Sequence, residues 1–183
     1  HSGRNSVLVL RPADVHETTV AWKLALENKN TPSALVLSRQ NIKDLPATTS
    51  RFEEALKADK GAYVVESDKN YDVILLASGS EVSTLVEGAA LLRKEGIGVR
   101  IVSVPSEGLF RKQSIEYQES VLPKGKKKFG LTAGLPVTLE GLVGADGSVW
   151  GLNSFGFSAP YKVLDEKLGF TAQNVYQQVK KIL

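Results

Sequence analysis

The feature that most constrains the fold is an alternation of short apolar runs with an amphipathic segment in the middle of the chain. Apolar runs at 73–77 and 99–104 flank the segment 81–94, whose apolar residues recur at helical spacing. This pattern predicts a helix between two buried strands. Ser80 fits the N-cap of that helix, and Gly96 fits its C-terminal cap. A strand–helix–strand order predicts parallel strands joined by a right-handed crossover, and therefore an α/β fold.

The alternation continues to the end of the chain. Further strands are predicted at 128–132 and 149–152, a helix at 112–119, and an element of either kind at 137–142. Ser158 and Thr171 each fit the N-cap of a closing helix, with Gly169 between them. Together these elements predict a three-layer α/β/α domain with a mostly parallel or mixed sheet.

A separate strand–helix–strand pattern precedes this domain. Apolar runs at 6–10 and 33–37 flank a helical pattern at 15–27. A unit this short cannot cover a parallel sheet on both faces, so we interpret it as a piece of a second α/β domain whose other strands lie elsewhere. The pattern weakens from 41 to 69, where we expect a connector with little local structure apart from a short strand at 62–66.

Composition excludes several kinds of protein. The chain has 183 residues, of which 42% are hydrophobic and 23% charged, as is typical of soluble globular proteins. No apolar run approaches the roughly 18–20 residues of a membrane span. Cysteine is absent, which excludes disulfides and thiolate metal sites and fits a reducing cytosol. Methionine is also absent, so we expect a piece of a longer or processed protein and leave residues 1–3 out of the fold prediction.

Four polar features favour structural roles over functional ones. The basic run at 124–128 has no interleaved aromatic residues and the net charge is only +3, so a solvated loop is favoured over a nucleic-acid site. His16 has no partner in sequence that would make a metal site. The turn 79–81 could bind an anion at a helix N-terminus, but it lacks the residues of a phosphate-binding loop, and plain capping is the better interpretation. The glycines at 141–147 have the wrong spacing for such a loop and indicate a turn.

Arg39 and Asp14 are the remaining candidates. Arg39 follows the carboxyl end of the 33–37 strand, and open α/β sheets bind ligands at that edge. Its planar guanidinium suits a phosphate, although an ordinary surface arginine is the alternative. Asp14 also lies at a strand end, but Glu17 three residues later resembles a capping box, and that role requires no ligand.

Several short motifs resemble the transketolase family. In chain order they are RPAD at 11–14 followed by Glu17, LSRQN at 37–41, ASGSEV at 77–82, ESVLP at 119–123, FG at 155–156 with SAP at 158–160, and GFT at 169–171. Each string is short, but their order and spacing together are specific and cover nearly all of residues 4–183.

The resemblance implies a fragment of an enzyme of the pentose phosphate pathway. Transketolases move a two-carbon ketol unit from a ketose phosphate to an aldose phosphate, using thiamine diphosphate and a divalent cation (Mg or Ca), as cytoplasmic homodimers. The resemblance makes residues 4–47 the tail of the pyrimidine-binding domain, 48–66 a connector and 67–183 the C-terminal domain. It also makes Arg39 a ligand of the sugar-phosphate substrate's phosphate group.

The departures from the family predict that the fragment is inactive alone. The diphosphate motif GDG, the GEDGPTH segment and the glutamate that activates the cofactor are not in this sequence, so no catalytic, cofactor-binding or metal-binding residue is expected here. The 136–148 segment also departs from the family. The alternatives are a fragment of deoxyxylulose-phosphate synthase or of a 2-oxoacid dehydrogenase β subunit, or a non-catalytic domain that binds a partner or a regulatory anion.

Overall fold

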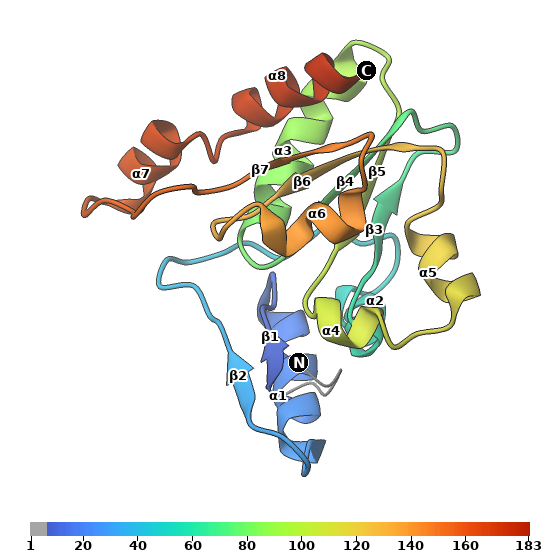
Figure 1. The fold of residues 1–183 in the computed structure, drawn as a ribbon, viewed down its shortest axis with the longest axis vertical. Helices are drawn as coiled ribbons and strands as arrows, with labels where there is room; N and C mark the ends of the chain where they lie inside the picture. The colour runs from blue at the N-terminus through green and yellow to red at the C-terminus, as the bar shows by residue number, and fades with distance from the viewer. Residues whose placement is uncertain (1–6) are drawn as a thin grey trace.

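The computed structural model describes residues 7–183 (Figure 1). Residues 1–3 and the first residue of the strand predicted at 6–10 lie outside the described residues. The described part contains a two-stranded sheet near the N-terminus and a five-stranded sheet that forms the larger domain. Within 7–183, no helix combines the length and apolar character that crossing a membrane requires.

The larger sheet has the strand order β3-β5-β4-β6-β7. Its strands are β3 (Tyr63–Ser67), β4 (Val73–Ala77), β5 (Val99–Ser103), β6 (Lys127–Leu131) and β7 (Ser148–Trp150). β3 is antiparallel to β5, and the other neighbours are parallel. Every residue of β4 is buried, as a central strand covered on both faces requires. The predicted fold class is confirmed: the sheet is parallel except for one edge strand.

Helices cover both faces of this sheet and complete the three layers (Figure 1). They are α3 (Glu81–Lys94) and α8 (Ala172–Ile182) on one face, and α4 (Glu107–Phe110), α5 (Ile115–Val121) and α6 (Val137–Val143) on the other. β4 serves both cores, because its successive side chains point to opposite faces. Leu75 packs in the core under α3 and α8, whereas Ile74 and Leu76 pack in the other.

The N-terminal piece is the predicted strand–helix–strand unit. β1 (Leu8–Leu10) pairs in parallel with β2 (Ser33–Leu35), and α1 (Val15–Glu27) connects them. Arg11 joins this unit to the larger domain, because its N–H donates to the Pro105 carbonyl at 2.8 Å and its carbonyl accepts from Gly79 N–H at 3.0 Å.

Residues 41–69 contain more structure than predicted. α2 (Arg51–Ala55) begins after Ser50, whose hydroxyl accepts from Glu53 N–H at 3.5 Å, and continues into the 3₁₀ helix η1 (Leu56–Lys60). Gly61 ends η1 in the left-handed conformation, with φ 85°. The sequence does not reveal these elements, because they are too short to show periodicity. They are stabilised by packing against α1, a contact that depends on the tertiary structure.

Three predicted boundaries or caps also need correction. The helix predicted at 112–119 begins later, at Ile115, because Ser114 accepts from Tyr117 N–H at 3.2 Å. Ser158 is not an N-cap: α7 (Tyr161–Leu168) starts after Pro160, and a residue before proline avoids the helical region. Ser80 sits at the N-cap position of α3, but its hydroxyl donates to the Glu81 carboxylate. The ambiguous 137–142 segment is the helix α6. The Thr171 cap is confirmed, with Asn174 N–H donating to its hydroxyl at 3.2 Å.

Candidate functional site

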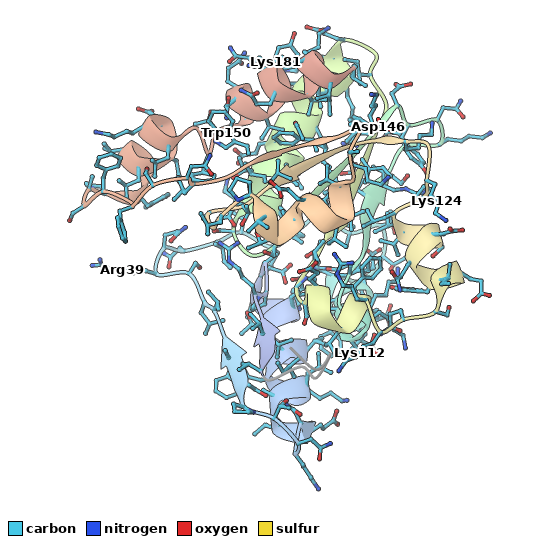
Figure 2. The ribbon with its side chains drawn as sticks, viewed as in Figure 1. Arg39, Lys112, Lys124, Asp146, Trp150 and Lys181 are labelled. Atoms are coloured by element: carbon cyan, nitrogen blue, oxygen red, sulfur yellow. The ribbon has the colours of Figure 1, made fainter. Side chains whose placement is uncertain are left out.

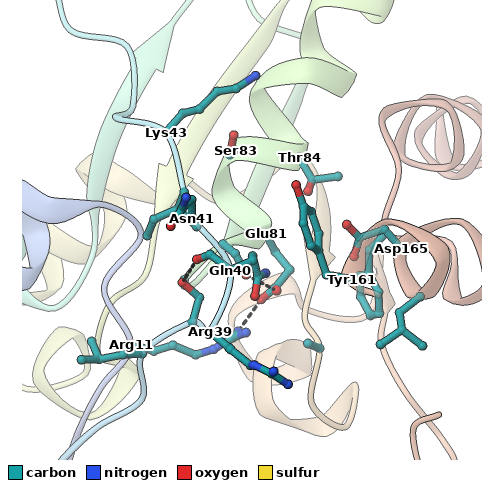
Figure 3. A pocket seen from close by; sticks show the side chains of 18 of the residues that line it. Arg11, Arg39, Gln40, Asn41, Lys43, Glu81, Ser83, Thr84, Tyr161 and Asp165 are labelled. Atoms are coloured by element: carbon teal, nitrogen blue, oxygen red, sulfur yellow. Dashed lines mark hydrogen bonds and ion pairs between the residues drawn. The ribbon is translucent and has the colours of Figure 1, made fainter. Parts of the chain in front are cut away.

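Arg39 lies in the loop 36–45 that leaves the carboxyl end of β2. Its side chain is exposed and extends away from the rest of the chain (Figure 2). The loop borders a cavity of about 710 Å³ between the N-terminal unit and the larger domain. Figure 3 shows the lining side chains, which come from the loop, from the first turns of α3 and from α7. The structure therefore places Arg39 at the rim of a cavity, at the sheet edge expected from the sequence.

The charges around the cavity leave Arg39 free to bind an anion. Arg11 forms an ion pair with Glu81 and donates to the Ser78 carbonyl at 3.0 Å, so its charge is compensated. Across the cavity, partial burial and then the nearby Glu81 raise the pKa of Asp165. Among residues 7–183, no side-chain hydrogen bond or ion pair engages Arg39. An unpaired guanidinium at an open rim suits a phosphate ligand.

The Arg39 loop is fixed at both ends to one short stretch of chain. Val36 N–H donates to the Leu10 carbonyl at 2.8 Å. Leu45 N–H donates to Asp14 Oδ2 at 3.1 Å, and the Leu45 side chain lies in the core. Between these two points the ion pairs are exposed or partly exposed, and Asp44 lies 3.7 Å from His16 of α1. Lys43 lies 3.9 Å from Glu87, with both side chains more than half exposed.

Asp14 belongs to a buried ionic cluster made of Asp14, Glu17, Arg51 and Tyr63. Arg51 Nε donates to Asp14 Oδ2 at 2.5 Å, and Arg51 Nη2 donates to the Tyr63 hydroxyl at 2.7 Å. The Tyr63 hydroxyl in turn donates to Glu17 Oε1 at 2.6 Å. The Asp14 and Glu17 side chains are fully buried, and the Arg51 side chain is 8% exposed.

The cluster shifts the pKa values of its members in opposite directions. Burial would raise the pKa of Asp14, but hydrogen bonds from Arg51 and from the backbone N–H groups of Glu17 and Leu45 hold it below its usual value. Burial raises the pKa of Glu17, and the hydrogen bond from Tyr63 only partly offsets this. Burial and the neighbouring Glu17 raise the pKa of Tyr63.

The N-cap prediction for Asp14 is confirmed, and the rest of the cluster was missed. Glu17 N–H donates to Asp14 Oδ1 at 2.8 Å, and Glu17 Oε2 accepts from Ala13 N–H at 2.8 Å, one residue away from a standard capping box. Arg51 lies 37 residues beyond Asp14 and Tyr63 lies 46 beyond Glu17. No local sequence signal connects residues so far apart.

The other candidates keep structural roles. At the N-terminus of α3, the Glu81 carboxylate pairs with Arg11 and accepts from the Ser80 hydroxyl. Gly144, with φ 80°, turns the chain between α6 and β7. His16 lies 3.7 Å from Asp44. Among residues 7–183, no group of three or more His, Asp or Glu side chains could hold a metal ion.

The basic run is partly a strand, contrary to the prediction of a solvated loop. Its Lys124 is exposed and pairs with Glu119 at 2.7 Å. Lys128, however, lies in β6 and is 9% exposed, and its ammonium donates to the Lys126 carbonyl at 3.3 Å. Burial lowers the pKa of Lys128. The apolar residues after the basic run form the strand β6, and this strand extends back to include the last two lysines of the run.

Comparison with known proteins gives a consistent result. A family model described as transketolase-like TK C-terminal domain matches residues 61–171. The transketolase of Staphylococcus epidermidis is 44% identical over 176 residues, which are 95% of this chain and 26% of that protein. A Bacillus subtilis transketolase is 44% identical over 179 residues, 96% of this chain and 26% of its own length.

Solved structures agree. The transketolase of Leishmania mexicana matches with a TM-score of 0.86 and 36% identity, over 97% of this chain and 25% of that one. A Pichia stipitis transketolase variant, solved in complex with fructose 6-phosphate, matches with a TM-score of 0.87 and 35% identity, over 98% of this chain and 25% of that one. The chain thus spans about a quarter of the length of the relatives it matches. Because the family model covers more than half of the chain, the protein belongs to the transketolase-like TK C-terminal domain family.

Proposed function

We propose that this chain acts as the C-terminal portion of a transketolase, which transfers a two-carbon ketol unit from a ketose phosphate to an aldose phosphate. The observation that carries the proposal is the exposed Arg39 at the rim of the cavity, within the LSRQN segment. A guanidinium holds a phosphate through parallel charged hydrogen bonds, so Arg39 binds the phosphate end of the sugar. The fructose 6-phosphate bound by the Pichia stipitis relative is a ligand of that class.

The proposed cofactors are thiamine diphosphate and a divalent cation, Mg or Ca, held by other parts of the full-length enzyme. Residues 7–183 do not fit the cation, because none of their acidic and histidine side chains form a group that could ligate it. The cofactor supplies the electron-sink chemistry, and the protein binds and orients it. We therefore expect the isolated chain to be inactive.

The proposed organisation assigns residues 4–47 to the end of the pyrimidine-binding domain, 48–66 to a connector and 67–183 to the C-terminal domain. The separate two-stranded and five-stranded sheets support two α/β units, and β3 begins within the connector. The exposed face of the small sheet, including Val9 at 50% and Val36 at 47% exposure, is what a partial sheet would leave uncovered. The intact enzyme is proposed to be a cytoplasmic homodimer of the pentose phosphate pathway.

The test is the preference of the full-length enzyme for a phosphorylated sugar. We define it as the kcat/KM for xylulose 5-phosphate divided by that for phosphate-free xylulose. Removal of a charged hydrogen-bond donor costs about 1.5–3 kcal/mol, so Arg39→Ala should lower the preference about 10- to 100-fold. Arg111→Ala, at an exposed arginine paired with Glu107, is the control and should leave it unchanged. An unchanged preference in Arg39→Ala would remove Arg39 from the site.

A further inference from the structure

We propose that Asp14, held in place by Arg51, is a positioning residue that fixes the Arg39 loop in its phosphate-binding geometry. The proposal rests on the proposed function, because it assigns Asp14 a role in the same site. Asp14 does not touch the cavity: its side chain is fully buried, and it acts through the backbone of Leu45.

The Asp14 carboxylate joins three segments of the chain. Asp14 Oδ1 accepts the backbone N–H of Glu17 at 2.8 Å and so fixes the start of α1. Oδ2 accepts the Leu45 N–H at 3.1 Å and Arg51 Nε at 2.5 Å. A single buried group therefore ties together the start of α1, the end of the Arg39 loop and the start of α2.

The Arg39 loop is anchored at its two ends. Its two ends bond to Leu10 and Asp14, which are close neighbours in sequence on either side of the β1–α1 turn. The loop is thus closed on a single rigid stretch. Ser38 Oγ donates to the Gln40 carbonyl at 3.1 Å and adds a local bond beside Arg39. The Lys43–Glu87 and His16–Asp44 pairs are exposed or partly exposed, and such pairs contribute little.

The burial of the cluster makes Asp14 a rigid support. The hydrogen bonds that lower its pKa keep the carboxylate ionised, so it remains an acceptor for Leu45 N–H. Arg51 is itself restrained by the Tyr63 hydroxyl at 2.7 Å. A ligand-binding side chain on a loop needs such a support, since misplacement by about 1 Å can cost up to about 100-fold in rate.

The experiment compares variants of the full-length enzyme by their preference for xylulose 5-phosphate over phosphate-free xylulose. This ratio does not depend on how much enzyme is folded. Asp14→Asn preserves the size of the side chain and removes its charge, and it should lower the preference about 10-fold. Arg51→Lys, which retains the positive charge but loses the planar fork, should lower it in the same direction and by less. Ser114→Ala removes the N-cap of α5, which packs on the opposite face of the sheet from α3, and should leave the ratio unchanged.

The outcomes separate this inference from the proposed function. In the Arg39→Ala background, Asp14→Asn should produce no further fall in the preference, because both changes act on one contact. If Arg39→Ala lowers the preference but neither Asp14→Asn nor Arg51→Lys does, the positioning role is wrong and the proposed function stands. If Arg39→Ala itself has no effect, both are wrong. A fall in kcat that is equal for the two sugars would assign Asp14 a purely structural role and overturn the inference.

Discussion

Replacing Arg51 by methionine tests the energetics of the buried cluster. The change keeps much of the apolar stem and removes the guanidinium that compensates Asp14 and bonds Tyr63. Loss of one partner from a buried ion pair costs about 3–5 kcal/mol, since the other charge stays buried. Two features place the cost of losing the Arg51 guanidinium at the lower end of this range. Glu17, with its raised pKa, shares less of the negative charge, and Arg51 Nη1 is buried without a partner among residues 7–183.

We therefore expect Arg51→Met to lower the free energy of unfolding of the 183-residue chain by about 3 kcal/mol at neutral pH. For a chain of this size, such a loss lowers Tm by roughly 6–12 °C. The assay is urea unfolding followed by the fluorescence of Trp22 and Trp150. The control is Arg111→Met at an exposed i,i+4 pair, which should cost about 0.5 kcal/mol or less.

The loss of unfolding free energy in Arg51→Met should depend on pH in one direction. In the parent chain, Asp14 has a lowered pKa, so it contributes stability above its ordinary value of 3.8 that is lost as pH falls through the folded pKa. Without Arg51, burial raises the pKa of Asp14, and protonation at low pH relieves the uncompensated charge. The difference between parent and variant should therefore shrink as pH falls. A loss no larger than that of Arg111→Met, or one that grows at low pH, would refute this reasoning.

Three further predictions concern other parts of the chain. Because the pKa of Glu17 is raised, this group contributes its full stability below the ordinary pKa of 4.5 and loses it as pH rises through the folded pKa. Glu17→Gln should therefore flatten the fall in Tm across that pH range, as measured by calorimetry. Gly88→Ala should destabilise by about 1–3 kcal/mol in urea unfolding, because a Cβ there would lie 2.6 Å from Val175 Cγ1, whereas Ala90→Ser on the exposed face of α3 should cost about 0.5 kcal/mol or less. Thiamine diphosphate with magnesium should leave the Tm of the isolated chain unchanged, and a saturable shift would contradict the fragment interpretation.

The elements predicted correctly are those whose signal is local. The bounds of β4 and α3 follow from a continuous apolar run and from helical spacing, and both match the structure. The Asp14 cap follows from a motif four residues long. In contrast, α2 and η1 have only five residues each and are stabilised by packing on α1, so no window of sequence reveals them.

The candidate site was predictable only in part, for the same physical reason. Arg39 could be found because its place after a strand and its chemistry are both visible in sequence. Its support could not, because the bond from Leu45 to Asp14 spans 31 residues and that from Arg51 spans 37. Contacts of this range depend on how α2 packs against α1, which is decided by the whole fold.

The stretch from Leu10 to Asp14 explains why the small N-terminal unit remains attached to the larger domain. Arg11 faces the larger domain: its backbone bonds Gly79 and Pro105, and its side chain pairs with Glu81. Leu10 and Asp14 hold the two ends of the Arg39 loop. This short segment thus connects the five-stranded sheet to the Arg39 loop. On the proposed function, this segment is the support through which the larger domain would steady the loop that carries Arg39.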